Sequence, residues 1–277
     1  MFNVILTTIA EYSAYDIALR IFFGAVIGLC LGMTGVGGGV LIIPVLRGVF
    51  AMSPVMAVGT ASLCAALMKI NAGIMHVRNG NVDWKNSALI LIGAAPVLLV
   101  ISLGIVQLSD NPETAEMVNQ GVEYLIVGVI AFSLMAMIKK TFGNSSNIKA
   151  NDTTEGFFNM KTLVSGAATG CIMGATGVGG GVLLLPLLSV TIGLDMKRSV
   201  GSSTVIALVL SSVGAIAYSG GGQSDIVTAF LLVVGSFIGV PMAGFLMKAM
   251  SDKRLQQISL GLISISAVVM LRAMFVQ

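Results

Sequence analysis

Two glycine-rich segments are the main candidates for ligand chemistry in this chain. Residues 32–44 read GMTGVGGGVLIIP and residues 174–186 read GATGVGGGVLLLP, so ten of the thirteen positions are identical. Each copy lies within a long apolar stretch, where closely spaced glycines interrupt a helix and leave backbone N–H groups without partners. The N-terminus of a helix carries about half a positive charge and binds anions through such groups. The two segments therefore predict an anion site built from the backbone of two broken helices.

The residues expected to contact the anion share either an exposed backbone or a polar side chain inside an apolar segment. The first group is Thr34, Gly35, Gly37, Gly38 and Gly39 in one copy, and Thr176, Gly177, Gly179, Gly180 and Gly181 in the other. The second group is Thr60, Ser62, Lys69, Asn71, Ser202, Ser203 and Thr204. Pro44 and Pro186 follow the two breaks, and we expect them to have a structural role in the short helices.

Each group also has a plainer explanation. Glycines often only bring membrane helices close together. Serine and threonine hydroxyls in such helices commonly bond back to the carbonyl four residues earlier. Lys69 lies about two turns from His76, so its amino group could extend to the cytoplasmic interface. What favours a site is that the glycines and the hydroxyls recur in both copies.

The composition places these segments in a membrane. Of the 277 residues, 56% are hydrophobic and 10% are charged, and the mean hydropathy is +0.98, whereas soluble domains are about 25% charged. Runs of about 20 apolar residues recur along the chain, which is typical of an integral membrane protein. The three cysteines and the single histidine have no metal-ligand spacing. We therefore expect no metal, no cofactor and no nucleic-acid partner.

The chain divides into two halves that match at a constant offset of 142 residues. Residues 57–62 align with 199–204, and residues 80–83 align with 222–225. The first half has apolar segments at 16–34, 38–50, 54–76, 84–108 and 116–138, and the second at 160–176, 179–192, 196–218, 225–249 and 254–276. The second segment of each set spans only about 20 Å as a helix, too little to cross a hydrocarbon core of about 30 Å.

We therefore predict an all-α polytopic membrane protein with 8–10 membrane segments. Each repeat has a glycine-broken or re-entrant helix pair and three spanning helices. The predicted boundaries are residues 1–138 for the first membrane repeat, 139–160 for a cytoplasmic linker and 161–277 for the second membrane repeat.

The loop charges predict that the second repeat is inverted relative to the first. Basic loops face the cytoplasm, which places Arg78 and Lys85 inside, together with Lys197 and Arg198 of the second half. The loops at 109–116 and 219–225 contain no lysine or arginine and are placed outside. Equivalent loops then face opposite sides, as in transporters whose halves are related by an axis in the membrane plane. Both termini are expected outside.

The paired motif resembles the TauE/SafE sulfite exporter family over essentially the whole chain. The residues that carry this resemblance are the block at 32–44, its copy at 174–186 and the Val-Gly-Thr and Val-Gly-Ser strings about fifteen residues after each block. The resemblance implies a multi-pass permease of the inner or plasma membrane for sulfite, sulfoacetate or other organosulfonates. Its expected partners are a small anion and the lipid bilayer, and a homodimer is a possible assembly.

Three other functions stay open on the sequence alone. The chain could transport another small organic or inorganic anion, or it could be an anion channel. The central segments contain almost no carboxylates apart from Glu123, which favours an exporter whose anionic cargo responds to the membrane potential over a proton-relay carrier. The third alternative is an intramembrane serine protease, with Ser202 or Ser203 as nucleophile and His76 as its base.

Overall fold

The computed structural model describes residues 12–34, 39–142, 160–178, 183–188, 192–249 and 252–276. These residues form helices and turns, and no strand occurs among them. The helices of the first half are α2 (Ala14–Thr34), α3 (Gly39–Gly48), α4 (Pro54–Arg78), α5 (Trp84–Asp110) and α6 (Pro112–Phe142). Those of the second half are α7 (Met160–Thr176), α8 (Leu184–Pro186), α9 (Met196–Gly220), α10 (Ile226–Ala249) and α11 (Asp252–Val276). The prediction of an all-α polytopic protein is confirmed.

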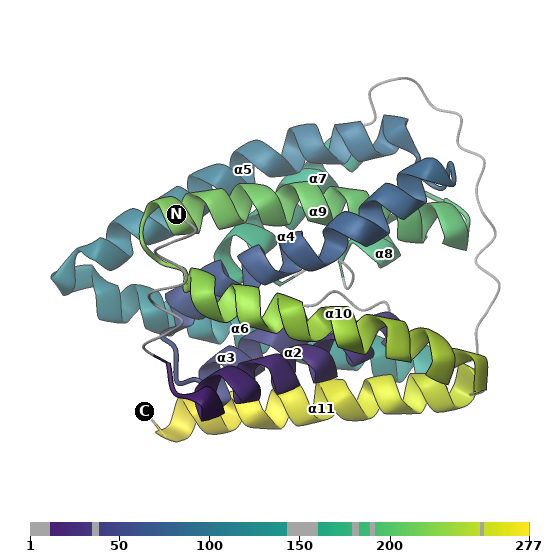
Figure 1. Cartoon of the computed structure of the whole chain (residues 1–277). Coiled ribbons are helices and arrows are strands. Elements are labelled where there is room, and N and C mark those ends of the chain that lie inside the picture. Colours follow the sequence, from purple (N-terminus) through teal and green to yellow (C-terminus); the bar gives the residue numbers. More distant parts are fainter. Residues whose placement is uncertain are drawn as a thin grey trace.

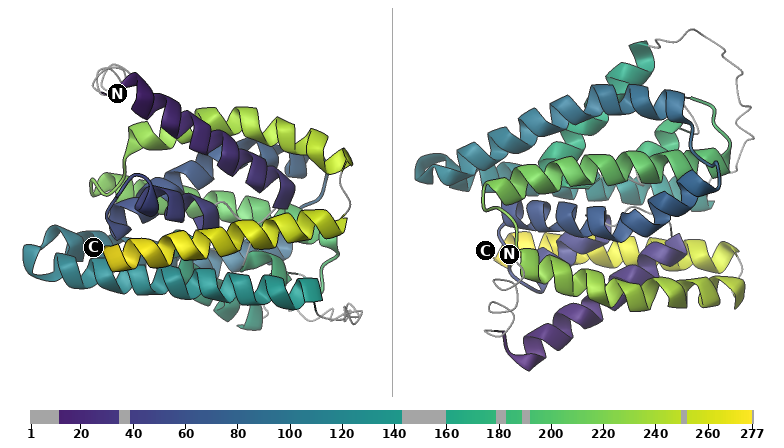
Figure 2. Two further views of the ribbon diagram at one scale, coloured as in Figure 1. Left: turned by 90° about the horizontal axis from the view of Figure 1, so that it is seen from below. Right: turned by 45° about the horizontal axis from the view of Figure 1, so that its top comes forward.

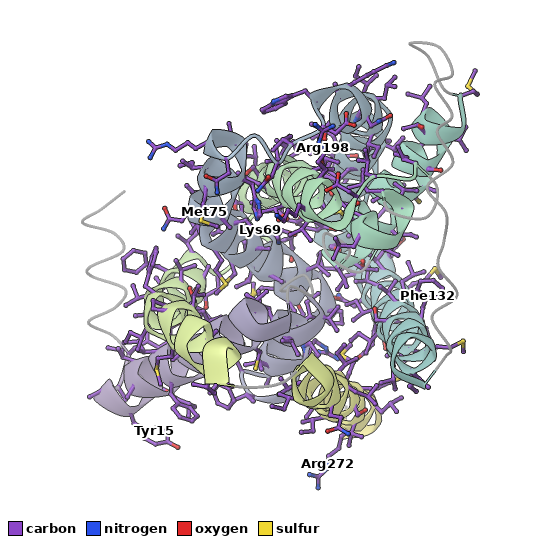
Figure 3. The ribbon with its side chains drawn as sticks, turned by 90° about the vertical axis from the view of Figure 1, so that its right-hand side faces the viewer. Tyr15, Lys69, Met75, Phe132, Arg198 and Arg272 are labelled. Carbon is purple, nitrogen blue, oxygen red and sulfur yellow. The ribbon has the colours of Figure 1, made fainter. Side chains whose placement is uncertain are left out.

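Six of these helices are long and apolar enough to cross a membrane, counting only the described residues. They lie in α2, α4, α5, α6, α9 and α10, and shorter apolar helices occupy 39–48, 162–176 and 260–274. Large apolar side chains such as Phe132 and Tyr15 project outward from the bundle (Figure 3). The chain is therefore a multi-pass membrane protein, with lipid as the solvent of its outer surface.

Most helices begin where the sequence provides a capping residue. The side chains of Ser53, Asp83 and Asp195 accept hydrogen bonds from the backbone N–H groups of Met56, Asn86 and Arg198. Each bond satisfies one of the four N–H groups that a helix leaves unpaired at its start. Polar residues thus lie at helix ends, outside the apolar spans.

One predicted boundary differs from the structure. Helix α6 extends to Phe142, four residues into the predicted linker, because the lysines after residue 138 are good helix formers and the helix can continue into water. In the segment expected at 179–192, the described residues include a helix at Leu184–Pro186 and two residues of π-helix at 187–188. Residues 179–182 and 189–191 lie outside the described residues, so a second short helix over the whole segment stays a prediction.

The first described helix of each half packs against the other half. Glycines of α2 lie against the backbone of α10, and glycines of α7 lie against that of α5. A Cβ atom on Gly24 would lie 2.2 Å from the Leu232 carbonyl oxygen, and one on Gly166 would lie 2.7 Å from that of Ile90. These two contacts are related by the 142-residue offset at both partners, so the packing is reciprocal.

Helices α4 and α9 form a second reciprocal pair. A Cβ atom on Gly59 would lie 2.0 Å from the Gln223 carbonyl oxygen, and one on Gly201 would lie 2.0 Å from that of Asn81. The start of each helix thus meets the loop after the end of the other, so the two helices are antiparallel. Such reciprocity is typical of a two-fold axis perpendicular to both helices. It supports the predicted inverted repeat, whose orientation in the membrane stays a prediction.

Two hydrogen bonds reinforce this pair at its two ends. The Thr60 hydroxyl oxygen accepts from the backbone N–H of Asp225 at 2.9 Å, and the Ser202 hydroxyl oxygen accepts from that of Asp83 at 2.8 Å. Both hydroxyl side chains are fully buried. Thr60 and Ser202, predicted as anion contacts, therefore bind the loops of the opposite half.

The two ends of the bundle carry opposite charge. In Figure 1 the start of α2, the end of α11 and the α5–α6 and α9–α10 connections lie at the left, and Figure 2 shows the same grouping from two other sides. The left end contains Asp110, Glu113 and Glu116; we name it the acidic end. The right end, with the α4–α5 connection and the start of α9, contains Arg78, Lys85, Lys197 and Arg198; we name it the basic end.

Replacing Gly59 or Gly201 with Ala should destabilise the protein by a similar amount. At either position the new methyl group must displace a backbone carbonyl, and overpacking typically costs about 1–3 kcal/mol. The measurement is thermal unfolding of the purified variants in detergent. Gly104→Ala in α5 is the control, because a Cβ atom there meets no atom within 4 Å; an equal loss in all three variants would contradict the reciprocal packing.

Candidate anion site at the helix breaks

The described parts of the two glycine segments touch each other. A Cβ atom on Gly39, the first residue of α3, would lie 2.7 Å from the carbonyl oxygen of Gly177 and 3.0 Å from the Cα atom of Val178. Gly177 follows the end of α7 and has a φ angle of +62°, a conformation that side chains other than glycine rarely adopt. The N-terminus of one short helix thus lies directly against the turn that ends α7.

The side chains of the second break satisfy the backbone that the broken helix leaves unpaired. In a continuous helix the carbonyl of Gly174 would accept from the N–H of Val178, but that N–H donates to the Thr176 hydroxyl at 3.2 Å. The Gly174 carbonyl instead accepts from the Tyr218 hydroxyl at 2.6 Å and from the Ser102 hydroxyl at 3.3 Å. Because unpaired backbone groups cost several kcal/mol in a membrane, these hydroxyls stabilise the break.

Six of the predicted glycines lie outside the described residues. They are Gly35, Gly37 and Gly38 of the first copy, and Gly179, Gly180 and Gly181 of the second. Thr34 is the last residue of α2, and Pro44 lies inside α3, which continues past it to Gly48. Pro186 is the last residue of α8. The role of each as a ligand or a structural element stays a prediction.

A line of polar residues runs along α4 from the break towards the basic end. Ser62, Lys69 and His76 are separated by seven residues each, a spacing that keeps side chains on nearly the same helical face. Ser62 marks the start of this line at the break, because its Oγ atom would lie 3.2 Å from a Cβ atom on Gly177. We name these three residues the α4 stripe.

The second half repeats this pattern on α9. Thr204, Ser211 and Tyr218 occupy the positions that align with the α4 stripe at the 142-residue offset; we name them the α9 stripe. Gly214 lies between Ser211 and Tyr218 on the same face, and a Cβ atom there would lie 3.5 Å from the Ser62 Oγ atom. The two stripes therefore face each other across the α4–α9 interface, running in opposite directions.

Lys69 lies at the centre of this arrangement. Ile70 is half-way between Gly59 and Asn81, the two points where α4 and its following loop meet the other half. The two-fold relation therefore passes close to Lys69, about 13 Å along the helix from its end at Arg78. The side chain is partly buried and lies on the side of α4 that faces α9 (Figure 3). No hydrogen-bond or ion-pair partner for its amino group occurs among the described residues.

The remaining predicted residues have other surroundings. Asn71 is exposed on α4, two residues from Lys69 and on a different face. The hydroxyls of Ser203 and Thr204 donate to the carbonyl oxygen of Val200 at 3.0 and 2.8 Å. This is the back-bonding that serine and threonine commonly make in membrane helices. Of the hydroxyl candidates, Ser62 is the one that the structure places beside the break, and it lies on nearly the same face of α4 as Lys69, two turns away.

Three residues of the two stripes were missing from the predicted site, namely His76, Ser211 and Tyr218. His76 has a buried Nδ1 atom without a hydrogen-bond partner among the described residues. The signal that could have identified all three was already in the sequence: a polar residue at every seventh position of α4 that the offset reproduces in α9. Single-residue inspection misses this pattern, because each position alone looks like an interfacial or packing residue.

The serine protease alternative receives no support from these contacts. The Ser202 hydroxyl oxygen accepts from the Asp83 N–H, and the Ser203 hydroxyl donates to Val200. No hydrogen bond joins His76 to either serine in the described part of the chain. A nucleophile needs a base within hydrogen-bond reach, so this arrangement does not activate either hydroxyl.

Replacing Tyr218 with Phe should destabilise the protein by about 1–3 kcal/mol, because the Gly174 carbonyl loses a donor in a buried position. Adding Ser102→Ala should cost more than the sum of the two single changes, since the carbonyl then has neither hydroxyl partner. Thermal unfolding of the two single variants and the double variant measures this coupling. Additive losses would show that the two hydroxyls do not share the carbonyl.

The sequence is similar to those of known membrane transporters. The family model for "Sulfite exporter TauE/SafE" matches residues 20–270. The probable membrane transporter protein YjnA of Bacillus subtilis is 25% identical over 251 residues, which cover 89% of this chain and 96% of that protein. A probable membrane transporter protein of Haemophilus influenzae is 28% identical over 208 residues, which cover 70% of each chain.

A third relative extends the comparison to an archaeon. The probable membrane transporter protein MJ0441 of Methanocaldococcus jannaschii is 24% identical over 209 residues, 72% of this chain and 71% of that protein. No solved structure matches significantly. Because the family model spans most of the chain, including α3, α4, α7 and α9, this membrane transporter belongs to the TauE/SafE sulfite exporter family.

Proposed function

We propose that this transporter exports small sulfur-containing anions, such as sulfite, sulfoacetate or other organosulfonates, and binds them beside Lys69. The observation that carries the proposal is the position of this lysine. It lies at the level where the two halves are related, on one face of α4 with Ser62, which packs against the turn at Gly177. An intramembrane lysine usually marks a substrate or ion pathway.

The charge around this lysine favours an anion over a cation. Helices α3, α4, α7 and α9 contain no aspartate or glutamate, so none of them supplies a carboxylate that would neutralise Lys69. A charge held in a low-dielectric interior is costly unless it is paired. A sulfite or sulfonate group would supply the missing negative charge and accept hydrogen bonds from the ammonium group.

The two stripes provide a route through the protein on both sides of Lys69. The α4 stripe leads from the break to His76 near the basic end, and the antiparallel α9 stripe leads from Thr204 to Tyr218 near the acidic end. In transporters built from inverted repeats, alternating access comes from rocking one repeat against the other around a fixed central site. A site at the level of the two-fold relation suits that mechanism, because it can open to either end.

The expected substrates can be tested by thermal unfolding of the purified protein in the presence of candidate anions. A ligand that binds only the folded protein raises the free energy of unfolding, and with it the unfolding temperature, once its concentration exceeds its dissociation constant. We expect a rise with sulfite or sulfoacetate, and a smaller one with taurine, which carries an ammonium group as well. Stabilisation by none of sulfite, sulfoacetate, thiosulfate and sulfate would contradict the sulfur-anion proposal.

The role of Lys69 can be tested with two substitutions. Lys69→Gln removes the charge and should weaken anion binding by about 10- to 100-fold, the loss expected for one hydrogen bond to a charged group. Lys69→Arg keeps the charge and should retain part of the affinity. Sulfite efflux from loaded proteoliposomes, measured with increasing substrate, gives the apparent affinity; saturation and competition by sulfoacetate would distinguish a carrier from a channel.

The matched control is Lys85→Gln, which removes an exposed lysine at the start of α5 at the basic end. It should leave the apparent affinity unchanged. If Lys85→Gln and Lys69→Gln weaken efflux equally, the effect of Lys69 comes from overall surface charge and not from a central site.

A further inference from the structure

Helix α3 lies between the candidate site and the acidic end. Its first residue, Gly39, contacts the turn at Gly177, and its last residue, Gly48, leads into the loop before α4 at the acidic end. Nearly the whole helix is buried, and Val40, Ile42 and Ile43 have no exposed surface. A movement of α3 would therefore reach the turn at Gly177, beside the start of the α4 stripe.

A buried ion pair holds the outer end of this helix. Arg47 in the last turn of α3 donates through Nη2 to the Glu123 carboxylate of α6, and through Nη1 to the Met52 carbonyl oxygen at 2.7 Å. The Arg47 side chain has no exposed surface, and the Glu123 side chain is 12% exposed. The pair thus joins the short helix to one of the long helices that form the outer wall (Figure 2).

Stability alone does not explain why the pair is there. Taking two charges out of water costs about as much as their attraction returns, so packed apolar residues would hold the helices equally well. Buried ion pairs are better suited to devices with two states, because the two charges can separate once water reaches them.

The carboxylate side of the pair borders open space. A cavity of about 330 Å³ adjoins Glu123 and is lined by Glu116, Asn119, Gln120 and Tyr124 of α6, with Pro54 and Met274 at its rim. Glu116, Gln120 and Tyr124 are exposed, so this cavity opens at the acidic end. Separation of the pair towards this cavity would leave Glu123 hydrated among polar groups.

The second half lacks a counterpart. The position that aligns with Arg47 is Ser189 in the sequence, and the position that aligns with Glu123 is Ile265 of α11. The only acidic residue of α11 is Asp252 at its start. The sequence of the second half therefore does not repeat the Arg47–Glu123 pair at the 142-residue offset.

We propose that Arg47 and Glu123 form a latch that keeps the acidic end closed and positions α3 against the site. They are positioning residues, because they act on the anion through α3. With the acidic end held closed, the resting protein loads its cargo from the basic end. This inference rests on the proposed function for its meaning in transport, but the latch itself can be tested without any transported anion.

The test measures how fast a thiol on α3 is modified from the acidic end. Ile43→Cys, in a background with Cys30, Cys64 and Cys171 replaced by Ala, places a buried thiol one turn before Arg47. Intact cells are treated with a membrane-impermeant thiol reagent. Glu123→Gln should speed the modification by about 5- to 150-fold, the range expected when a coupling of ordinary size is lost.

Glu123→Gln leaves Arg47 buried without its charge partner and could prevent folding, so a second variant is needed. Arg47→Gln/Glu123→Gln removes both charges and should speed the modification over the same range. Asp16→Asn is the matched control, because it breaks the partly exposed Asp16–Arg20 contact of 3.8 Å at the same end and should change nothing. Equal modification rates in the parent and the double variant would overturn the latch.

A second thiol distinguishes opening from general loosening. Ile206→Cys places a fully buried thiol on α9 in the second half, and it should stay protected in every variant. If it reacts faster together with Ile43→Cys, the substitutions loosen the whole bundle and the latch is overturned. The thiol readout needs no substrate. Faster modification of Ile43→Cys in a protein that shows no sulfite flux would contradict the proposed function and leave the latch standing. Sulfite flux with unchanged modification rates would overturn the latch and leave the proposed function standing.

Discussion

The arrangement of this protein depends on one constraint, the close reciprocal contact between the two halves. Gly59 and Gly201 let each loop carbonyl approach the opposite helix, and the hydroxyls of Thr60 and Ser202 hold the loop backbones in place. Because α4 and α9 are clamped at both ends, their polar stripes face each other and their midpoint is fixed. Lys69 owes its central position to these contacts and not to any partner of its own.

The same constraint lets the helices break inside a membrane. A break leaves carbonyl and N–H groups that lipid cannot satisfy, and in α7 the Gly174 carbonyl is satisfied by Tyr218 of α9 and Ser102 of α5. The hydroxyls that stabilise the break come from helices that the reciprocal packing brings alongside α7. The packing between the halves therefore also supplies the hydrogen bonds that the break requires. This explains why polar residues occupy these buried positions.

Much of the fold could be predicted from the sequence because membrane helices are long and their backbone hydrogen bonds form within each helix. The apolar segments at 54–76 and 84–108 correspond to α4 and α5 within a few residues, and the 142-residue offset holds in the contacts of Gly24 and Gly166. The site was harder to predict. Thr60 and Ser202 have the residue type of anion ligands, but their partners are loop N–H groups of the other half, about 120 to 165 residues away. The Arg47–Glu123 pair was missed for the same reason, since only the folded chain brings α3 to α6.

The exchanged packing of the first helices also bears on how the chain is made. Gly24 of α2 rests on Leu232 of α10, so α2 waits for a partner that is synthesised some two hundred residues later. Until then its glycine face has only lipid or the insertion machinery to cover it, and the first half cannot reach its final packing alone. The final packing of α2 therefore follows the synthesis of α10, a dependence that joins the two halves during assembly.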